Sequence, residues 1–325
     1  MVTRILQAGP MMGMLEDDLN GEFSVLRIPE HDSSKYPADN GSVHDESVEF
    51  LRQNAGGIEI AVTTGEAGLS GEQILAMPHL RAIANFGAGY DATDVATARA
   101  RGIVIGNTPD VLTDCVADLA VGLLISVLRG IGAADRFVRR GKWVDGPFPL
   151  AAKVTGKRVG IVGLGRIGRA IANRLGAFEM TISYHNRHRV LDVPFHYADS
   201  VQQLAAECDV LIVAATGGPE SAGLVSADVL AALGPAGYLI NVARGSVIDE
   251  TALVQALTDG TIAGAGLDVF TDEPRVPLAL LNMENVVLVP HIGSGTMESR
   301  RAMADLVLAN IRQFLADGTL VTPVY

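Results

Sequence analysis

Three short segments in the second half of the chain carry side chains that could move a proton and bind an anion. The segment "NVARGSVID" contains Arg244, "LDVFTDEP" contains Asp268 and Glu273, and "VPHIGSG" contains His291. An imidazole can donate a proton near neutral pH. A guanidinium can bind a carboxylate through paired donors and polarise a carbonyl oxygen. Each residue taken singly is more often structural, so the interpretation depends on the surrounding sequence.

A glycine-rich segment predicts a site for the pyrophosphate of a dinucleotide. In "VGLGRIG", Gly163, Gly165 and Gly168 follow the apolar run "RVGIV" and lead into the helical pattern "RIGRAIANRLGAF". In this context the first glycine permits a tight turn, the second lets the backbone approach phosphate, and the third lets the helix pack on the strand. The helix N-terminus then faces the anion. A purely structural turn is the alternative; the expected loop also includes Leu164, Arg166 and Ile167.

The next expected strand end indicates which dinucleotide is bound. A carboxylate about twenty residues after the glycines would bind both ribose hydroxyls of NAD and repel the 2′-phosphate of NADP. The segment "SYHNRHR" instead has Asn186, Arg187 and His188 at that place. An amide and a planar guanidinium can donate hydrogen bonds to a phosphate. We therefore expect NADP(H) as the preferred cofactor and weak acceptance of NAD(H), with a solvated basic turn as the alternative.

These segments need elements that bring them together, and the sequence predicts two α/β units with parallel sheets. Short β-rich runs alternate with helical patterns over residues 58–106 and again over residues 158–291. This alternation is typical of βαβ units, which place ligands at the carboxyl ends of their strands. Between the two series we expect one long helix over residues 113–140, and after His291 a terminal amphipathic helix.

Composition narrows the class of protein. Of 325 residues, 48% are hydrophobic, which suffices for one large or two ordinary domains. The formal net charge of −12 argues against a nucleic-acid partner. No apolar run is long enough for a signal peptide or a membrane span, and Cys115 and Cys208 are expected to be reduced, so we expect a cytoplasmic protein. We expect no metal, because the other histidines lack metal-ligand spacing: His31, His44, His79, His185, His188 and His196.

Taken together, the motifs resemble the D-isomer-specific 2-hydroxyacid dehydrogenases over most of the chain. The segments "NFGAGYD", "NTPDVLTDCVADL", "GLGRIG", "NVARGSVIDE", "GLDVFTDEP" and "PHIGS" occur in the order of that family. The resemblance implies two Rossmann-like or flavodoxin-like α/β domains with parallel sheets, the cofactor domain inserted into the substrate domain, and a homodimer. We expect residues 1–99 and 288–325 to form the substrate-binding domain, and residues 100–287 to form the dinucleotide-binding Rossmann domain.

The family also implies a role for each candidate residue. Reduction of a 2-keto acid needs a proton donor and an anchor for the carboxylate, while a nicotinamide supplies the hydride. By resemblance, His291 donates the proton and Glu273 favours its protonated form. Arg244 binds the substrate carboxylate opposite Ala88 and Gly89, for which a plain turn is the alternative. The other residues expected to border the cofactor are Thr113, Thr216, Val242, Ala243, Asp268 and Gly293.

Some positions depart from the family pattern or admit another reading. The segment "ATGGPES" from Ala215 replaces the common "PLTPET", which weakens the assignment of Thr216, and Cys115 stands where an acid is frequent. Capping of a strand end is an alternative role for Asp268. Three residues either line the substrate pocket, in the same or a neighbouring subunit, or serve core or interface packing: Trp143, Phe148 and Leu150.

Within the family, "FPLAAKVTGKRVGIVGLGRIG" and the acid-free "SYHNRH" resemble the NADPH-dependent glyoxylate and hydroxypyruvate reductases, including the plant hydroxyphenylpyruvate type. The resemblance implies a small 2-keto or 2-hydroxy acid as the substrate. A reductase of a bulkier acid, such as 2-ketogluconate or hydroxyphenylpyruvate, is the first alternative. A nucleotide-sensing co-repressor is an alternative of another class. Such a sensor would not need Arg244, Glu273 and His291 together.

Overall fold

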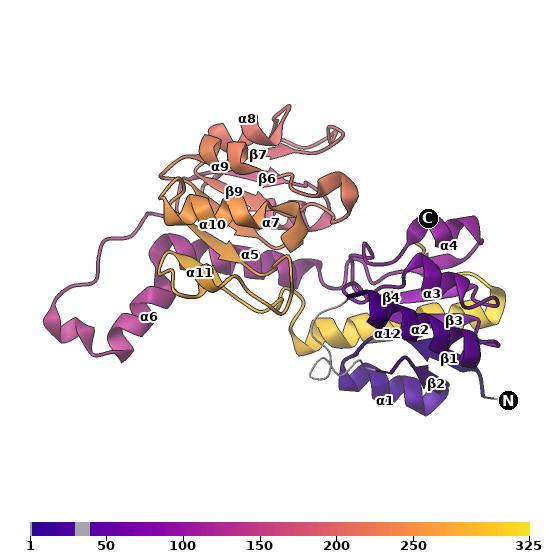
Figure 1. Cartoon of the computed structure of the whole chain (residues 1–325). Helices are drawn as coiled ribbons and strands as arrows, with labels where there is room; N and C mark the ends of the chain where they lie inside the picture. Colours follow the sequence, from indigo (N-terminus) through magenta and orange to yellow (C-terminus); the bar gives the residue numbers. More distant parts are fainter. Residues whose placement is uncertain (1, 30–39) are drawn as a thin grey trace. The chain divides into compact units, whose positions relative to one another are not determined.

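The structure, a computed structural model, describes residues 2–29 and 40–325, with no side-chain description for residues 40–45. His31 therefore lies outside the described residues, as does the side chain of His44. The chain divides into unit 1, formed by Met1–Leu112 and Met297–Tyr325, and unit 2, formed by Thr113–Thr296. Unit 2 is thus inserted into the chain of unit 1 (Figure 1).

Unit 1 is built on a parallel sheet of five strands in the order β2-β1-β3-β4-β5, which is the flavodoxin-like order. The strands are apolar because a parallel sheet is covered on both faces; every residue of β4 is buried. The strands are β1 (Arg4–Gln7), β2 (Ser24–Arg27), β3 (Ile60–Thr64), β4 (Ala82–Phe86) and β5 (Val104–Gly106).

Helices cover this sheet, and the last of them comes from the far end of the chain. The terminal helix α12 (Met297–Asp317) packs against β4 and α1, and in Figure 1 it appears in yellow among the indigo elements. Its buried side chains, including Met303, Val307 and Ile311, recur at helical spacing, as expected for an amphipathic helix. The other helices are α1 (Gly13–Glu22), α2 (Asn40–Asn54), α3 (Gly71–Leu75) and α4 (Val95–Ala100).

Unit 2 contains a seven-stranded parallel sheet in the order β12-β11-β10-β9-β6-β7-β8. The chain runs outward from β6 to β8 and then returns to start again at β9, so the strand order reverses between β6 and β9. Open α/β sheets bind ligands at such a reversal. The strands are β6 (Arg158–Val162), β7 (Thr181–His185), β8 (His196–Tyr197), β9 (Val210–Val213), β10 (Tyr238–Asn241), β11 (Gly264–Leu267) and β12 (Val286–Leu288).

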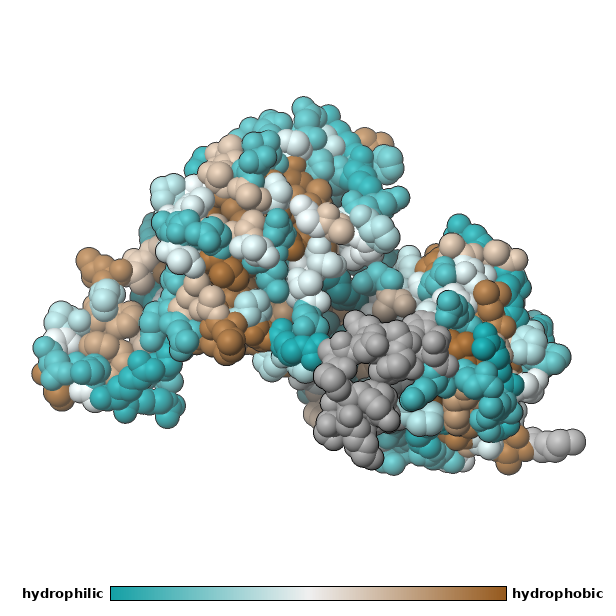
Figure 2. Space-filling view, viewed as in Figure 1, coloured by the Kyte–Doolittle hydropathy of each residue, from teal (hydrophilic) through white to brown (hydrophobic). Residues whose placement is uncertain are grey.

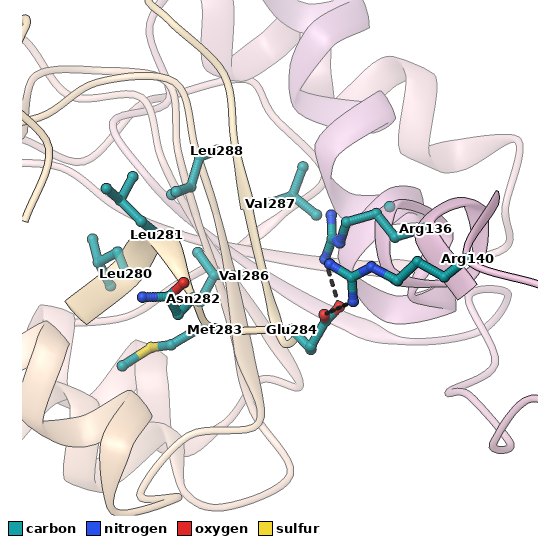
Figure 3. A pocket seen from close by; sticks show the side chains of 11 residues that line it. Arg136, Arg140, Leu280, Leu281, Asn282, Met283, Glu284, Val286, Val287 and Leu288 are labelled. Carbon is teal, nitrogen blue, oxygen red and sulfur yellow. Dashed lines mark hydrogen bonds and ion pairs between the residues drawn. The ribbon is translucent and has the colours of Figure 1, made fainter. Parts of the chain in front are cut away.

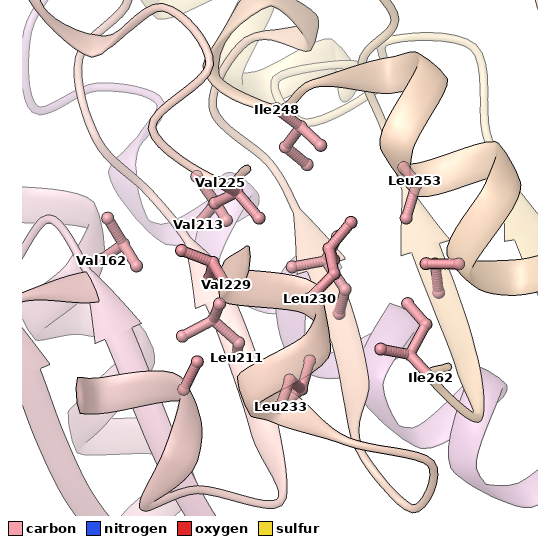
Figure 4. Packing of buried hydrophobic residues seen from close by; sticks show 14 of the residues in the cluster. Val162, Leu211, Val213, Val225, Val229, Leu230, Leu233, Ile248, Leu253 and Ile262 are labelled. Carbon is pink, nitrogen blue, oxygen red and sulfur yellow. The ribbon is translucent and has the colours of Figure 1, made fainter. Parts of the chain in front are cut away.

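The core of unit 2 lies between this sheet and its helices. Figure 4 shows Leu211 of β9 near Val229 and Leu230 of α9, with Leu253 of α10 and Ile262 close by. Each such buried side chain stabilises the fold by about 1.5–3 kcal/mol, which keeps the strand ends rigid. The helices are α5 (Thr113–Arg129), α6 (Ile131–Arg139), α7 (Arg166–Gly176), α8 (Val201–Ala206), α9 (Ala227–Leu233), α10 (Glu250–Thr258) and α11 (Leu278–Leu281), with 3-10 turns η1 (Lys142–Asp145), η2 (Pro219–Ser221) and η3 (Gly245–Val247).

The prediction of one helix over residues 113–140 is wrong, because the helix breaks at Gly130. This glycine has φ of 59°, in the left-handed region that glycine adopts at little cost. α5 and α6 meet at 60°. α5 buries one face in the core, whereas no residue of α6 is buried. No single helix in the described part of the chain is long and apolar enough to cross a membrane; α5 and α6 pass such a test only as a bent pair.

The unit boundaries, at residues 112/113 and 296/297, fall later in the chain than the expected domain boundaries at residues 99/100 and 287/288. The sheets explain the difference. β5 pairs with β4, which keeps residues 100–112 in unit 1. After β12, the N–H groups of Val289 and His291 donate to the carbonyl oxygens of Leu267 and Asp268, which holds this segment against the end of β11 in unit 2. His291 consequently belongs to the same unit as Arg244 and Glu273.

Candidate active site

The candidate residues of unit 2 gather at one edge of its sheet. Parallel strands point the same way, so the segments after their carboxyl ends share that edge. Thr113 differs, because it begins α5, and Ala88 and Gly89 follow β4 of unit 1. The segments at the edge begin with Gly163 after β6, Asn186 after β7, Val242 after β10 and Asp268 after β11. Thr216 and His291 each lie three residues beyond the ends of β9 and β12.

The three glycines of the β6–α7 turn have different steric surroundings, and two of them have no room for a side chain. Gly163 has φ of 96°, and a Cβ there would lie 2.6 Å from the backbone nitrogen of Ala215. A Cβ on Gly168 would lie 2.2 Å from the carbonyl oxygen of Gly163. A Cβ on Gly165, at the N-terminus of α7, would meet no protein atom within 4 Å. The turn therefore presents bare backbone at a helix N-terminus, which fits a pyrophosphate.

Asn186 ties the end of β7 to this turn. Its Oδ1 accepts a hydrogen bond of 2.6 Å from the backbone N–H of Leu164, and its carbonyl oxygen accepts one of 3.1 Å from the Tyr197 hydroxyl. The amide therefore shapes the glycine-rich turn, a role that the sequence analysis did not foresee. Its Nδ2 group is the part that could donate to a ligand.

Arg187 forms an ion pair with Glu220 of η2. Both side chains are about three-quarters exposed, at 76% and 75%, and His188 beside them is also exposed. Glu220 is not among the residues expected from the sequence, although it lies in "ATGGPES", the segment that departs from the family pattern. A phosphate at this place would compete with the Glu220 carboxylate for Arg187.

His291 and Glu273 form a close pair. His291 Nδ1 lies 2.7 Å from Glu273 Oε2, and Glu273 Oε1 accepts a 2.8 Å hydrogen bond from the backbone N–H of Phe270. Burial raises the pKa of Glu273, but the hydrogen bonds from His291 and Phe270 and the charges of His291 and Arg244 outweigh it and lower that pKa overall. Glu273 is therefore ionised at neutral pH, and its charge favours a protonated imidazole.

Asp268 holds the segment that carries His291. Its side chain is 2% exposed and accepts hydrogen bonds from the backbone N–H groups of Ile292 at 2.6 Å and Gly293 at 2.9 Å. Its carbonyl oxygen accepts a third, of 2.9 Å, from the N–H of His291. Burial raises the pKa of Asp268, against the opposing effect of these N–H groups and of His291. The carboxylate thus caps the turn in which His291 adopts φ of 50°.

Arg244 is positioned by two residues that the sequence analysis missed. Asn241, at the end of β10, accepts from the N–H of Ala243 at 3.1 Å and donates to the carbonyl of Arg244 at 3.0 Å. A Cβ on Gly245 would lie 2.0 Å from the carbonyl carbon of Phe270, so the segments of Arg244 and Glu273 are in close backbone contact. Both residues belong to the segment "NVARGSVID". Asn241 could have been recognised there, because it is a polar residue at the end of an apolar strand.

For the other expected residues named here, the structure gives their burial and one ring contact. Thr216 is exposed, while Val242 and Ala243 are buried directly after β10. Phe148 packs edge-to-face on Phe137 with ring centroids 5.4 Å apart, which favours a packing role. Trp143 and Leu150 are exposed.

A separate cavity of about 380 Å³ contains none of the candidate residues. It lies between α6 and the segment from α11 to β12 (Figure 3). Arg136 and Arg140 on its rim both pair with Glu284, at 2.6 and 3.5 Å. One carboxylate therefore offsets one of the two positive charges on this rim.

Comparison with known proteins identifies relatives of this chain. Residues 121–293 match the family described as "D-isomer specific 2-hydroxyacid dehydrogenase, NAD binding domain". Hydroxyphenylpyruvate reductase of Plectranthus scutellarioides is 43% identical over 320 residues, 98% of each chain. 2-Ketogluconate reductase of Gluconobacter oxydans is 45% identical over 278 residues, 86% of this chain and 90% of that protein.

A solved structure is similar along the whole chain. It is the NADPH-dependent glyoxylate/hydroxypyruvate reductase of Sinorhizobium meliloti in complex with NADP and malonate, with a TM-score of 0.88 and 44% identity, covering 100% of this chain and 97% of that one. The two-domain α/β fold expected from the sequence is confirmed, and the protein is an oxidoreductase with a nicotinamide cofactor. The chain belongs to the D-isomer specific 2-hydroxyacid dehydrogenase family.

Proposed function

We propose that this enzyme reduces a small 2-keto acid, glyoxylate or hydroxypyruvate, to the 2-hydroxy acid with NADPH. The observation that carries the proposal is the pair of His291 and Glu273, at 2.7 Å, together with the close backbone contact between Gly245, beside Arg244, and Phe270, whose N–H binds Glu273. The pair provides a proton donor and Arg244 an anion anchor, which are what this reduction needs from the protein. The solved relative with this fold is named as a reductase of these two acids.

The geometry suggests how the residues share the work. Because His291 Nδ1 is engaged by Glu273, Nε2 is the atom that gives its proton to the keto oxygen. The Glu273 carboxylate stabilises the imidazolium before this transfer. Arg244 binds the substrate carboxylate and polarises the keto group, and the backbone N–H groups of Ala88 and Gly89 bind the same carboxylate. The nicotinamide, when bound, supplies the hydride.

The preference for NADPH rests on the end of β7. That strand ends without an acid, so no carboxylate there repels a 2′-phosphate, and Arg187 exchanges Glu220 for the phosphate. Asn186 Nδ2 and His188 add donors, and NADH is accepted weakly because it offers Arg187 no phosphate. The residues proposed to border the rest of the cofactor are the turn Gly163–Gly168, Thr113, Thr216, Val242, Ala243, Asp268 and Gly293.

A reductase of a bulkier 2-keto acid is the second candidate. It is favoured by two relatives over 40% identical, named for hydroxyphenylpyruvate and 2-ketogluconate. The two proposed activities use the same proton donor and differ only in the size of the substrate side chain that the site accommodates. A panel of these four acids, measured as kcat/KM with NADPH and with NADH, separates them. We expect the highest kcat/KM for glyoxylate or hydroxypyruvate with NADPH; equal rates with NADH would refute the role of Arg187.

The proton donor is tested directly by His291→Ala. This variant should lose turnover by orders of magnitude and still bind NADPH, as measured by quenching of protein fluorescence. His79→Ala removes an exposed histidine of unit 1 and serves as the matched control. Near-normal turnover of His291→Ala would overturn the assignment.

We also propose a cytoplasmic homodimer. Cys115 and Cys208 form no disulfide within the described part of the chain, which fits a reducing compartment. The segment from α6 to η1 exposes apolar side chains, with Trp143 68% and Val144 91% exposed, and Figure 2 shows brown side chains over it. Such surface usually contacts another protein, and a second copy of the chain is the partner we propose. Light scattering should give twice the mass of 34.1 kDa, and Val144→Asp should lower it toward the monomer.

A further inference from the structure

The turn after β4 in unit 1 is held from its inner side by two amide side chains. Asn85, the fourth residue of β4, donates from Nδ2 to the carbonyl oxygens of Gly87 at 3.1 Å and Gly89 at 2.8 Å. Asn107, just after β5, donates from Nδ2 to the carbonyl oxygen of Ala88 at 2.8 Å. All three carbonyl groups of the turn are therefore bound by asparagines.

Because the peptide bond is planar, the fixed carbonyl groups also determine the direction of the neighbouring N–H groups. In a trans peptide the C=O of one residue and the N–H of the next point opposite ways. Holding the carbonyls of Gly87 and Ala88 inward therefore turns the N–H groups of Ala88 and Gly89 outward. The N–H of Gly87 is already used, since it donates to Thr108 Oγ1 at 3.1 Å. Within residues 2–29 and 40–325, no acceptor takes the N–H of Ala88 or of Gly89.

Burial of the polar side chain of Asn85 does not favour the stability of the fold. Its side chain is 1% exposed, and its Oδ1 has no hydrogen-bond partner among the described residues. An unsatisfied buried carbonyl destabilises a fold, so an apolar side chain would serve packing better. The residue is explained by the two donors of its Nδ2 group.

Asn107 is itself fixed by the C-terminal tail of unit 1. The hydroxyl of Thr322 donates to its carbonyl oxygen at 2.6 Å, and its N–H donates to the carbonyl of Thr322 at 3.3 Å. Thr322 is held in turn by the buried Asn310, whose Nδ2 donates to its hydroxyl at 2.8 Å. These bonds fix the backbone of Asn107, and with it the position from which the side-chain amide donates to Ala88.

We propose that Asn85 and Asn107 are positioning residues for the substrate carboxylate. They aim the N–H groups of Ala88 and Gly89 at the anion, Asn85 through the carbonyl of Gly87 and Asn107 through that of Ala88. A hydrogen bond to a carbonyl also polarises the peptide, which strengthens the N–H of the same peptide as a donor. This inference rests on the proposed function, in which the same N–H groups bind the carboxylate of a 2-keto acid.

The test is steady-state kinetics of Asn107→Ala with glyoxylate and NADPH, together with the inhibition constant of oxamate, which carries the same carboxylate. Misaligning one of the charge-assisted bonds should raise KM and the oxamate constant together by about tenfold. We expect kcat to stay within about threefold, and the Kd of NADPH to stay unchanged, because neither amide lies in unit 2. Asn85→Ala should act in the same direction through the N–H of Ala88.

Asn54→Ala is the matched control, since it removes an amide-to-carbonyl bond of 2.9 Å from a half-buried asparagine of the same unit, outside the turn. It should leave KM unchanged. If Asn107→Ala does not fold, Asn107→Asp keeps the size of the side chain, loses the donor and should raise KM at least as much. If a folded Asn107 variant has an unchanged KM and an unchanged oxamate inhibition constant, the inference is overturned. The proposed function is not affected by that result as long as the wild type turns over a 2-keto acid. Failure of the wild type on every 2-keto acid would instead refute the proposed function.

Discussion

Single alanine substitutions at three glycines, in α7 and in the turn before it, should distinguish effects on NADPH binding from effects on the stability of the fold. At Gly168 the added Cβ would lie 2.2 Å from the Gly163 oxygen, about 1.2 Å inside the 3.4 Å at which ordinary contact begins. Both atoms belong to backbone or are fixed to it, so α7 must move away from the turn. Overpacking of this kind costs about 1–3 kcal/mol, and Gly168→Ala should lose stability and NADPH binding together.

At Gly165 the added Cβ would meet no protein atom, so Gly165→Ala should unfold at the wild-type temperature. The methyl group would instead stand where the backbone approaches the pyrophosphate. Loss of one charge-assisted hydrogen bond, about 1.5–3 kcal/mol, should raise the Kd of NADPH by about 10- to 100-fold. Gly176→Ala, also in open space at the other end of α7, is the control and should change neither quantity for the worse.

The assay pairs thermal unfolding with a fluorescence titration of NADPH for each variant. The informative result is the difference between the two positions in the turn. If Gly165→Ala bound NADPH as tightly as the wild type, the reasoning that places the pyrophosphate on this turn would be refuted. If Gly168→Ala were as stable as the wild type, the rigidity assumed for the contact between α7 and Gly163 would be wrong.

Three further predictions concern the charges of Glu273 and Glu220. Glu273→Gln removes the carboxylate that favours protonated His291, so the rate of keto-acid reduction should begin to fall at lower pH than in the wild type, as a pH–rate profile would show. Because the partners of Glu273 lower its pKa in the folded state, its contribution to stability should be present at neutral pH and be lost as pH falls through that lowered pKa, which unfolding at a series of acidic pH values would reveal. Glu220→Gln releases Arg187, so the KM for NADPH should fall about two- to fivefold while the KM for NADH stays constant; a parallel change for both cofactors would count against the exchange of partners.

The features that could be predicted from the sequence are those set by neighbouring residues. The turn Gly163–Gly168 is local, and its three glycines have distinct steric requirements that the spacing already expresses. Strand and helix periodicity sufficed for two parallel sheets, because strands buried on both faces read as continuous apolar runs. The break at Gly130 escaped prediction because a glycine is also tolerated inside a helix, and its conformation depends on what the flanking segments pack against.

The features that escaped prediction depend on partners distant in the sequence. Glu220 meets Arg187 across 33 positions, and Asn107 meets Ala88 across 19. The periodicity of a single segment contains no information about such pairs.

The insertion of unit 2 within unit 1 has a consequence for synthesis on the ribosome. Unit 2 is continuous and complete once Thr296 has emerged, so nothing further along the chain is needed for its sheet. Unit 1 is discontinuous, because the apolar side chains of α12, which pack on β4, are translated only after unit 2. During that interval the first sheet made is the last to be covered, and its apolar surface is open to aggregation or to chaperones. The order of folding is therefore expected to be the reverse of the order of translation.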